Sequence, residues 1–330
     1  LRTTQKETPS HKTFFDFSSD QGLLGAVEKC NGAGKCLSVA PSGTMCPSYR
    51  ATRDEKHNTR GRANVLRDVL MQNKAPNAFD SEVLKEVLDL CLSCKACATE
   101  CPSSVDISTY KSEFLYQYQK SNGSSLRDKL FAYVGRLNRL TQPVSLVQNW
   151  IFRTPFTSAL LKKGLGIAQQ RSLPKLEKSL FKSLKNNKLK YNTKSVYLYL
   201  DEFSNYNETN IGKDAIELLE GLGYSVKVLR PTESGRSFIS KGFLKQAKKC
   251  SDQNVLRYHP LISEKTPLLG IEPSAIYTFS DEYPKLSSYP KKAKELASYC
   301  YLIETFLAKE LENNIIQTEQ FHLDTKEIKV

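Results

Sequence analysis

The first third of the chain shows apolar residues at helical spacing, separated by short polar loops. TRGRANVLRDVLMQ (59–72) gathers its apolar residues on one helical face, and SEVLKEVLDL (81–90) does the same behind Ser81. Ser81 is a favoured N-cap residue. A third helix is predicted to begin near Asp106 or Ser108. This region is therefore predicted to be all-α, with its loops held between helices.

The next stretch, residues 124–194, remains helical and becomes strongly basic. Residues 145–167 are amphipathic and include the only tryptophan, Trp150. We expect their apolar face to pack into a core, with a membrane-surface helix as the alternative. Residues 162–194 carry ten Lys and Arg against one acid, Glu177. A solvated helix face or linker is favoured over a nucleic-acid groove, because recognition aromatics are few.

The pattern changes to strands alternating with helices near residue 195. SVYLYL (195–200) and YSVKVLR are predicted strands on either side of a helical segment, NIGKDAIELLEGLG. A strand–helix–strand unit predicts a parallel sheet. LLGIE (268–272) is a further strand, followed by a helix with Pro273 in its first turn. Residues 291–312 are predicted to form one long helix.

Composition and charge narrow the class of protein. The chain has 330 residues, of which 39% are hydrophobic and 25% charged, as expected of a globular protein with two or three domains. It has no signal-peptide pattern and no apolar run of about 18 residues. The formal charge of +13 allows nucleic acid, anionic lipid or an acidic partner. We expect a cytoplasmic location, with the inner face of the membrane as an option.

Nine cysteines are present, and four of them fall in CLSCKACATECP (91–102). The spacing C-x2-C-x2-C-x3-C-P is typical of bacterial ferredoxins, in which three cysteines bind one cluster and the fourth serves another. Zinc would favour two separated Cys pairs. The motif therefore predicts that Cys91, Cys94 and Cys97 bind a 4Fe-4S cluster and that Cys101 is a ligand of a second cluster.

The missing fourth ligand is predicted to be Cys46. It precedes Pro47, repeating the Cys-Pro step that ends the four-cysteine run, and by the crossing rule it completes the first cluster. The second site has fewer ligands. Its predicted ligands are Cys30, Cys36 and Cys101. Ala33 occupies the middle position of the C-x2-C-x2-C motif, where a cysteine would be expected.

Three contents of the second site remain open. It holds a three-iron (3Fe-4S) cluster, or a 4Fe-4S cluster with water, His57 or Asp54 on the fourth iron, or nothing. For His57 an ordinary imidazole is favoured. Cys250 and Cys300 are isolated in the sequence and are expected to be small buried side chains.

Three segments carry a family resemblance. FFDFSSDQGLLGAVEKCNGAGKC, GTMCPSYRATRDEKHNTRGRANVLR and LDLCLSCKACATECPSSVD resemble the iron–sulfur part of FAD-linked oxidases of the D-lactate and D-2-hydroxyglutarate dehydrogenase-like kind. The resemblance is specific over about residues 13–120 and looser to the end. It implies a flavin domain ahead of this segment, and we expect the chain to be a fragment of a longer protein.

The resemblance extends to the second half as a cysteine-rich module with a Cys-Cys-Gly hallmark. At that place this chain has Glu233-Ser234-Gly235, and Ala275 stands where relatives have a cysteine. The module is therefore degenerate. Glu272 is expected to cap a helix rather than catalyse.

The resemblance also includes basic residues beside the first cluster motif. Arg53, Arg60 and Arg62 lie in the matching stretch. Cations near a thiolate-bound cluster raise its potential, whereas ordinary surface salt bridging is the alternative role.

Together these features predict a multidomain chain with four segments. They are a leading segment (1–26), a helical 4Fe-4S ferredoxin-type domain (27–123), a basic helical connector (124–194) and an α/β cysteine-rich-like module (195–330) that is truncated.

The predicted function is electron relay within a D-lactate-like dehydrogenase. Single electrons pass from FAD in a partner domain to a quinone or another carrier, with peripheral membrane association as an option and no nucleic acid. This segment alone is not expected to be catalytic. Two rivals are a zinc-organised nucleic-acid-binding protein and a scaffold subunit with a structural cluster.

Overall fold

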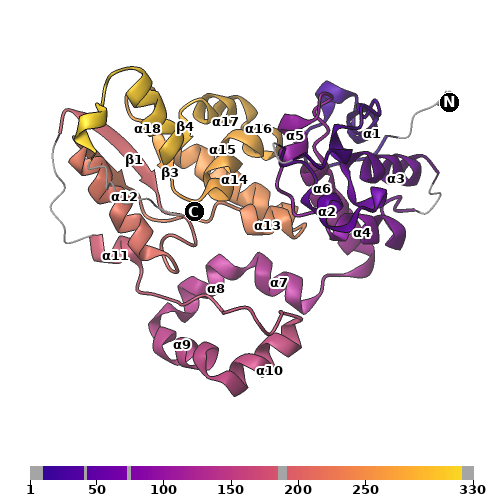
Figure 1. Cartoon of the computed structure of the whole chain (residues 1–330), viewed down its shortest axis with the longest axis horizontal. Helices are drawn as coiled ribbons and strands as arrows, with labels where there is room; N and C mark the ends of the chain where they lie inside the picture. The colour runs from indigo at the N-terminus through magenta and orange to yellow at the C-terminus, as the bar shows by residue number, and fades with distance from the viewer. Residues whose placement is uncertain (1–9, 41–42, 73–75, 185–191, 322–330) are drawn as a thin grey trace. The chain divides into compact units, whose positions relative to one another are not determined.

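The computed structural model describes residues 10–40, 43–72, 76–184 and 192–321 (Figure 1). They divide into two compact units, Leu1–Ala132 with Ser237–Lys248, and Tyr133–Arg236 with Lys249–Val330. This division is coarser than the four predicted segments, which stay a prediction.

The first unit is helical, and its described residues contain no strand. Its two best-capped helices start where the sequence predicts. Ser81 accepts a hydrogen bond from the Leu84 N–H, and Asp106 accepts one from the Thr109 N–H. The helices are α1 Leu23–Glu28, α2 Pro47–Thr52, α3 Thr59–Gln72, α4 Glu82–Asp89, α5 Ala96–Glu100, α6 Ile107–Asn122 and α7 Leu126–Ala132.

The longest helix of this unit, α6, anchors the segment that precedes α1. Glu113 is buried, and its Oε2 accepts the backbone N–H groups of Phe14 and Phe15 at 2.9 and 3.2 Å. Tyr110 donates from its hydroxyl to the carbonyl of Ala26 at 2.9 Å. These contacts fix the start of the chain's described part on the helix that follows the cysteine loop.

The second unit contains a four-stranded parallel sheet of order β2-β1-β3-β4, as the strand–helix–strand pattern predicts. Helix α12 (Thr209–Gly221) connects the first two strands. The strands are β1 Lys194–Tyr199, β2 Tyr224–Val228, β3 Leu268–Gly270 and β4 Cys300–Leu302. The fold class predicted from the sequence, an all-α region followed by an α/β region, is confirmed.

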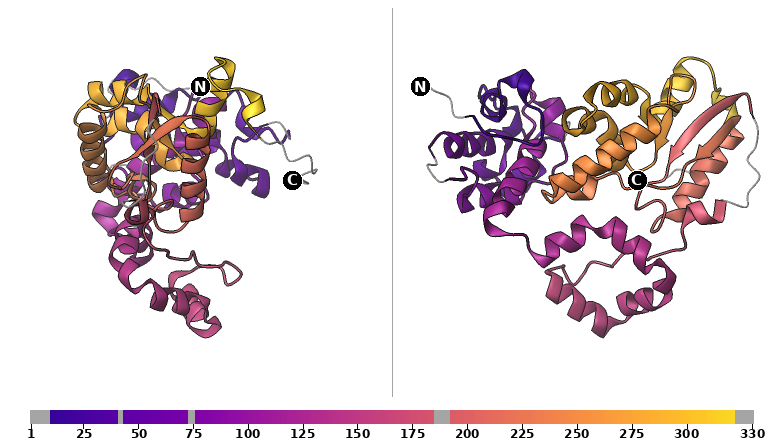
Figure 2. Two further views of the ribbon diagram at one scale, coloured as in Figure 1. Left: turned by 90° about the vertical axis from the view of Figure 1, so that its left-hand side faces the viewer. Right: turned by 180° about the vertical axis from the view of Figure 1, so that it is seen from behind.

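Helices cover both faces of the sheet (Figure 2). Val196 and Leu198 face a cluster with α12 and α18 (Ile303–Glu312). On the opposite face, Tyr199 packs with residues of α14, α15 and α17. The helices on that face are α14 Leu244–Tyr258, α15 Pro273–Asp281, α16 Tyr283–Leu286 and α17 Pro290–Ala297, after the short α13 Arg236–Ser240.

The prediction of one long helix over 291–312 is wrong. Two helices, α17 and α18, flank β4, whose Cys300 pairs with Leu268. A strand of three residues is too short to show a period of two, so its apolar residues merge into the neighbouring helical pattern. Residues Cys300–Leu302 are extended because they pair with β3.

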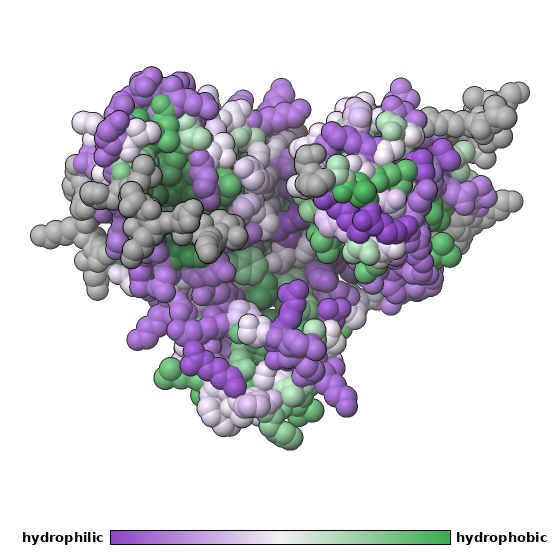
Figure 3. Space-filling model, in the orientation of Figure 1, coloured by the Kyte–Doolittle hydropathy of each residue, from purple (hydrophilic) through white to green (hydrophobic). Residues whose placement is uncertain are grey.

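The expectation that residues 145–167 pack into a core is also wrong. Trp150 is 63% exposed and Leu146 is 84% exposed, and no residue of α9 is buried. Figure 3 shows apolar and hydrophilic residues side by side on this helical lobe. The helices of the lobe are α8 Val134–Thr141, α9 Ser145–Arg153 and α10 Pro155–Leu165, followed by α11 Leu180–Leu184. Of the basic stretch, Lys185, Lys188 and Lys190 lie outside the described residues.

Within the described ranges, no helix is both long enough and apolar enough to cross a membrane.

Candidate metal centre

The loop between α4 and α5 contains Cys91 and Cys94, and Cys97 follows in α5. Ser93 and Lys95 adopt left-handed conformations with φ of 54° and 62°, and Cys46 on the facing segment has φ of 53°. Each such residue costs about 1 kcal/mol outside glycine, so the surrounding structure must hold it. The left-handed Lys95 ends the loop and α5 begins at once, which places Cys94 and Cys97 close together.

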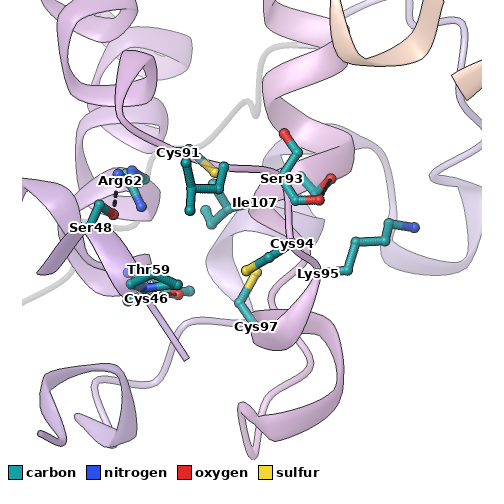
Figure 4. Close-up of a pocket in the computed structure, with 13 residues that line it drawn as sticks. Cys46, Ser48, Thr59, Arg62, Cys91, Ser93, Cys94, Lys95, Cys97 and Ile107 are labelled. Atoms are coloured by element: carbon teal, nitrogen blue, oxygen red, sulfur yellow. Dashed lines mark hydrogen bonds between the residues drawn. The ribbon is translucent and has the colours of Figure 1, made fainter. Parts of the chain in front are cut away.

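Four cysteines line one small cavity, namely Cys46, Cys91, Cys94 and Cys97. Figure 4 shows Cys94 and Cys97 turned toward Cys46 and Thr59, while the Lys95 side chain points away. No carboxylate lines this cavity. A donor set of sulfur alone suits soft metals and iron–sulfur clusters.

Thr59, the first residue of α3, holds the sulfur of Cys46. The Thr59 N–H donates to Cys46 Sγ at 3.1 Å, and Thr59 Oγ1 lies 3.0 Å from the same sulfur. Both residues are buried. These contacts can orient the sulfur and stabilise negative charge on it, and nothing in the sequence motif indicates them.

Two cations fix the backbone around the cavity. Arg62 is 2% exposed; its Nε donates to the Val87 carbonyl at 3.1 Å and its Nη2 to Ser48 Oγ at 2.9 Å. Lys111 donates from Nζ to the Cys91 carbonyl at 2.8 Å, and burial lowers its pKa. A thiolate-bound cluster is net negative, so these positive groups would stabilise one bound in this cavity.

Burial favours the protonated thiol at two of the cavity's cysteines, Cys46 and Cys97. It raises the pKa of Cys97 to about 12, and it also raises the pKa of Cys46. Ligation requires the thiolate, so metal binding releases protons here.

Within the described ranges, no three His, Cys, Asp or Glu side chains converge as one metal ion requires. Cluster ligands bind different irons and need not converge on one point.

In the second predicted site, Cys30 lies close enough to Cys36 to influence its thiol. Cys36 is buried in a short turn, Lys35–Leu37; burial and neighbouring Cys30 raise its pKa, the Arg60 backbone N–H lowers it, and the net result is a rise. Cys101 is half-buried at the end of α5. The grouping of these three cysteines therefore stays a prediction.

The alternative ligands for that site have other partners. His57 is buried, and its Nδ1 lies 2.9 Å from Thr52 Oγ1. Asp54 caps a short turn by accepting the Lys56 N–H at 3.0 Å. Arg53 is exposed at the end of α2. An ordinary structural imidazole remains the better interpretation of His57.

Residues singled out in the second half take structural roles. Glu272 accepts the Ser274 N–H at the start of α15 and is the predicted helix cap. Cys250, Cys300 and Ala275 are buried. The predicted helix cap at Glu272 and the predicted burial of Cys250 and Cys300 are confirmed.

The class of protein follows from the cysteine region. Residues 26–105 match the family of 4Fe-4S dicluster domains, and this range includes all seven cysteines of the two predicted sites. This part of the chain is therefore similar to 4Fe-4S dicluster domains.

Most of the chain is similar to part of larger dehydrogenases. It is 26% identical over 309 residues to D-2-hydroxyglutarate dehydrogenase of Escherichia coli K12, covering 80% of this chain and 30% of that protein. The D-2-hydroxyglutarate dehydrogenase of Pseudomonas putida is 26% identical over 328 residues, covering 87% and 32%. The chain thus spans about a third of the length of these relatives.

A second kind of relative matches a shorter part. One subunit of the anaerobic glycerol-3-phosphate dehydrogenase of E. coli K12 is 25% identical over 174 residues, covering 51% of this chain and 44% of that relative. No solved structure matches the chain. The resemblance predicted from the motifs is confirmed: the chain is similar to part of these dehydrogenases, and its residues 26–105 are similar to 4Fe-4S dicluster domains.

Proposed function

We propose that this segment relays single electrons from an FAD-binding dehydrogenase domain to a quinone or another carrier. The observation that carries the proposal is the single cavity lined by Cys46, Cys91, Cys94 and Cys97 inside a 4Fe-4S dicluster domain. Bound clusters accept and release one electron at a time, whereas a reduced flavin holds two.

The four cavity cysteines are the proposed ligands of a complete 4Fe-4S site. Thr59 supports this role by holding Cys46, and Lys111 by holding the Cys91 backbone. Cys30, Cys36 and Cys101 are the proposed ligands of the second cluster. This site holds a 4Fe-4S cluster with one non-cysteine ligand, a three-iron cluster, or no cluster.

The activity of the complete protein is proposed from its relatives. Two of them are named D-2-hydroxyglutarate dehydrogenases, which supports oxidation of a D-2-hydroxy acid by a flavin domain on the same or another chain. The glycerol-3-phosphate dehydrogenase relative is one subunit of its enzyme, which supports assembly with a dehydrogenase partner. In this proposal the present segment binds no substrate for oxidation.

Replacing single cysteines tests the ligand set. Cys94→Ser should lower the iron bound per chain by about one cluster, since serine is a poor ligand for this kind of site. The matched control is Cys300→Ser. Cys300 is buried in the sheet, and its Sγ donates a hydrogen bond to the Leu296 carbonyl at 3.2 Å. Equal iron content in both variants would exclude Cys94 as a ligand.

A second proposal concerns the lobe of α9 and α10, which we propose to bind an anionic membrane surface. Leu146, Trp150 and Phe156 are largely exposed. Residues 145–165 contain three basic side chains and no acid. Exposed apolar groups combined with positive charge suit an anionic lipid interface, where the acceptor quinone would dissolve.

The single tryptophan reports on this membrane proposal. Trp150 emission should shift to shorter wavelength with vesicles containing about 30% phosphatidylglycerol, because the indole enters a less polar region. Phosphatidylcholine vesicles are the lipid control, and Phe156→Ser should weaken binding. Unchanged emission at saturating anionic lipid would contradict membrane docking.

A further inference from the structure

A large cavity opens in the second unit, away from every predicted cluster ligand. Its volume is about 610 Å³. Its wall includes Glu202, just after β1, and the segment Arg230–Glu233, just after β2. The carboxyl ends of parallel strands are where open α/β sheets bind ligands. Helices α8 and α14 complete the wall.

The cavity is strongly basic. Lys249 and Arg257 lie two helical turns apart on α14, and Arg136 and Arg139 lie one turn apart on α8, so each pair lies on one helical face. Arg230 adds a fifth cation from the loop after β2. Only two carboxylates line the cavity, those of Glu202 and Glu233.

Both of those carboxylates are already engaged. Glu233 Oε2 accepts from Arg136 Nε at 2.9 Å. Glu202 is buried, and its two oxygens accept the N–H and the hydroxyl of Ser234 at 2.9 and 2.7 Å. Neither carboxylate forms an ion pair with the other four cations of the cavity wall.

Four cations therefore stay uncompensated within the described part of the chain. None of them forms an ion pair with a described carboxylate; they are Arg139, Arg230, Lys249 and Arg257. Gathering like charges around one cavity is unfavourable unless an anion joins them.

Helix α8 packs closely against the residues that form the rest of the cavity wall. A Cβ on Gly135 would lie 2.9 Å from the Glu202 Cβ and 3.1 Å from Glu233 Oε1, so glycine permits this close approach. Asn138, also on α8, is buried and donates to Asn207 Oδ1 at 2.9 Å. The two arginines of α8 are thereby held against the α/β fold.

We propose that this cavity binds a small organic anion that carries at least two carboxylate or phosphate groups. Arginine guanidinium groups form paired hydrogen bonds with both kinds of group. Cations from two helices and a loop surround a hollow, which suits a discrete ligand rather than an extended polymer. The proposal does not depend on the clusters.

A metal ion fits this cavity poorly. Cys250 is the only sulfur in its wall, and burial raises the pKa of that thiol to about 12. The four unpaired positive charges around the cavity repel a metal cation. The degenerate Glu233-Ser234-Gly235 site thus borders an anion pocket instead of a cysteine cluster.

Calorimetry on the full 330-residue chain tests the proposal. Glutarate and pyrophosphate are titrated at fixed ionic strength, with acetate as the single-charge control. At least one of the two multiply charged probes should bind at least tenfold more tightly than acetate. Glutarate binding alone would indicate a dicarboxylate ligand, and pyrophosphate binding alone a phosphorylated one.

Variants localise the binding. Arg230→Gln and Arg257→Gln should each weaken binding of the tighter probe at least tenfold. Lys291→Gln, an exposed lysine on α17 of the same unit, is the matched control and should change nothing. Thermal melting confirms that all three variants fold.

Three outcomes would overturn the inference. Both multiply charged probes could bind no better than acetate, or the control variant could weaken binding as much as the cavity variants. Tighter binding of duplex oligonucleotide or anionic vesicles, lost in the Arg230 and Arg257 variants, would assign this surface to a macromolecule instead.

Discussion

Thr59 is the residue through which the structure most directly influences the proposed cluster. Its N–H and hydroxyl both lie within about hydrogen-bond distance of Cys46 Sγ, at 3.1 and 3.0 Å. Hydrogen bonds to a ligand sulfur stabilise the more negative, reduced cluster and so raise its reduction potential.

Thr59→Val removes the hydroxyl and retains the backbone N–H. The potential should fall by about 40 mV, because one net hydrogen bond is worth about 1 kcal/mol for a one-electron couple. A redox titration followed by EPR measures the shift.

Thr278→Val is the control, since Thr278 Oγ1 donates only to the Ser274 carbonyl in α15. An unchanged or higher potential in the Thr59 variant would show that the hydroxyl does not act on the cluster.

Glu202 makes the stability of the second unit depend on pH. Burial raises its pKa to about 7, and neighbouring Asp201 adds to the rise. A raised carboxyl pKa means that the folded state binds the proton more tightly than the unfolded state. Stability is therefore greatest below the unfolded pKa and falls as pH rises through about 7.

Glu202→Gln should remove this dependence. The variant should be more stable than the parent by about 3 kcal/mol at pH 8, and similar to it below about pH 4.5. Urea unfolding at both pH values measures the difference. A variant equally destabilised at both would assign Glu202 a purely structural hydrogen-bonding role.

For single residues, the sequence predicts the cysteine ligands better than the residues that hydrogen-bond to them. The spacing of Cys91, Cys94 and Cys97 is a local pattern, so it is visible in the chain. The contact of Thr59 with Cys46 depends on where α3 begins relative to a loop 13 residues earlier. Lys111 reaches the Cys91 carbonyl across 20 residues, and no motif marks such a pair.

Among the secondary-structure elements, β3 and α15 make an unusually close approach. A Cβ on Gly270 would lie 2.4 Å from the Cβ of Ile276. Gly270 ends β3, and Ile276 is buried in α15, so glycine allows the helix to pack directly on the strand.

Gly270→Ala should destabilise the second unit by about 1–3 kcal/mol, the usual cost of overpacking. Chemical unfolding measures the loss. Gly221→Ala is the matched control at the end of α12, where nothing lies within 4 Å of an added Cβ. It should be neutral or slightly stabilising. Equal stability of both variants would contradict the close packing.

Helices and strands long enough to repeat their apolar pattern were predictable from the sequence, and shorter ones were not. The helix over 59–72 and the strands at 195 and 224 show several repeats, so their patterns identify them. β4 has three residues and exists because β3 offers it a parallel edge. The exposed lobe around Trp150 has an amphipathic pattern, but a pattern alone does not say whether another element covers the apolar face.

The molecule as a whole combines a sulfur-lined centre with two basic regions. The first unit has the features of a cluster site, and the second carries the cationic cavity and the lobe of α9 and α10. A formal charge of +13 is consistent with anionic partners for both basic regions. The relatives' names, rather than any contact in this chain, support the link to D-2-hydroxy-acid oxidation.

The most direct test of the relay is to purify the chain without oxygen, quantify iron and acid-labile sulfide, and record EPR spectra before and after reduction. The account predicts at least about four irons and four sulfides per chain and a signal that appears on one-electron reduction. About eight irons would fill both sites with cubanes, and about seven, with a signal in the oxidised state, would place a three-iron cluster at the second. A colourless protein that contains zinc and no iron would contradict the account.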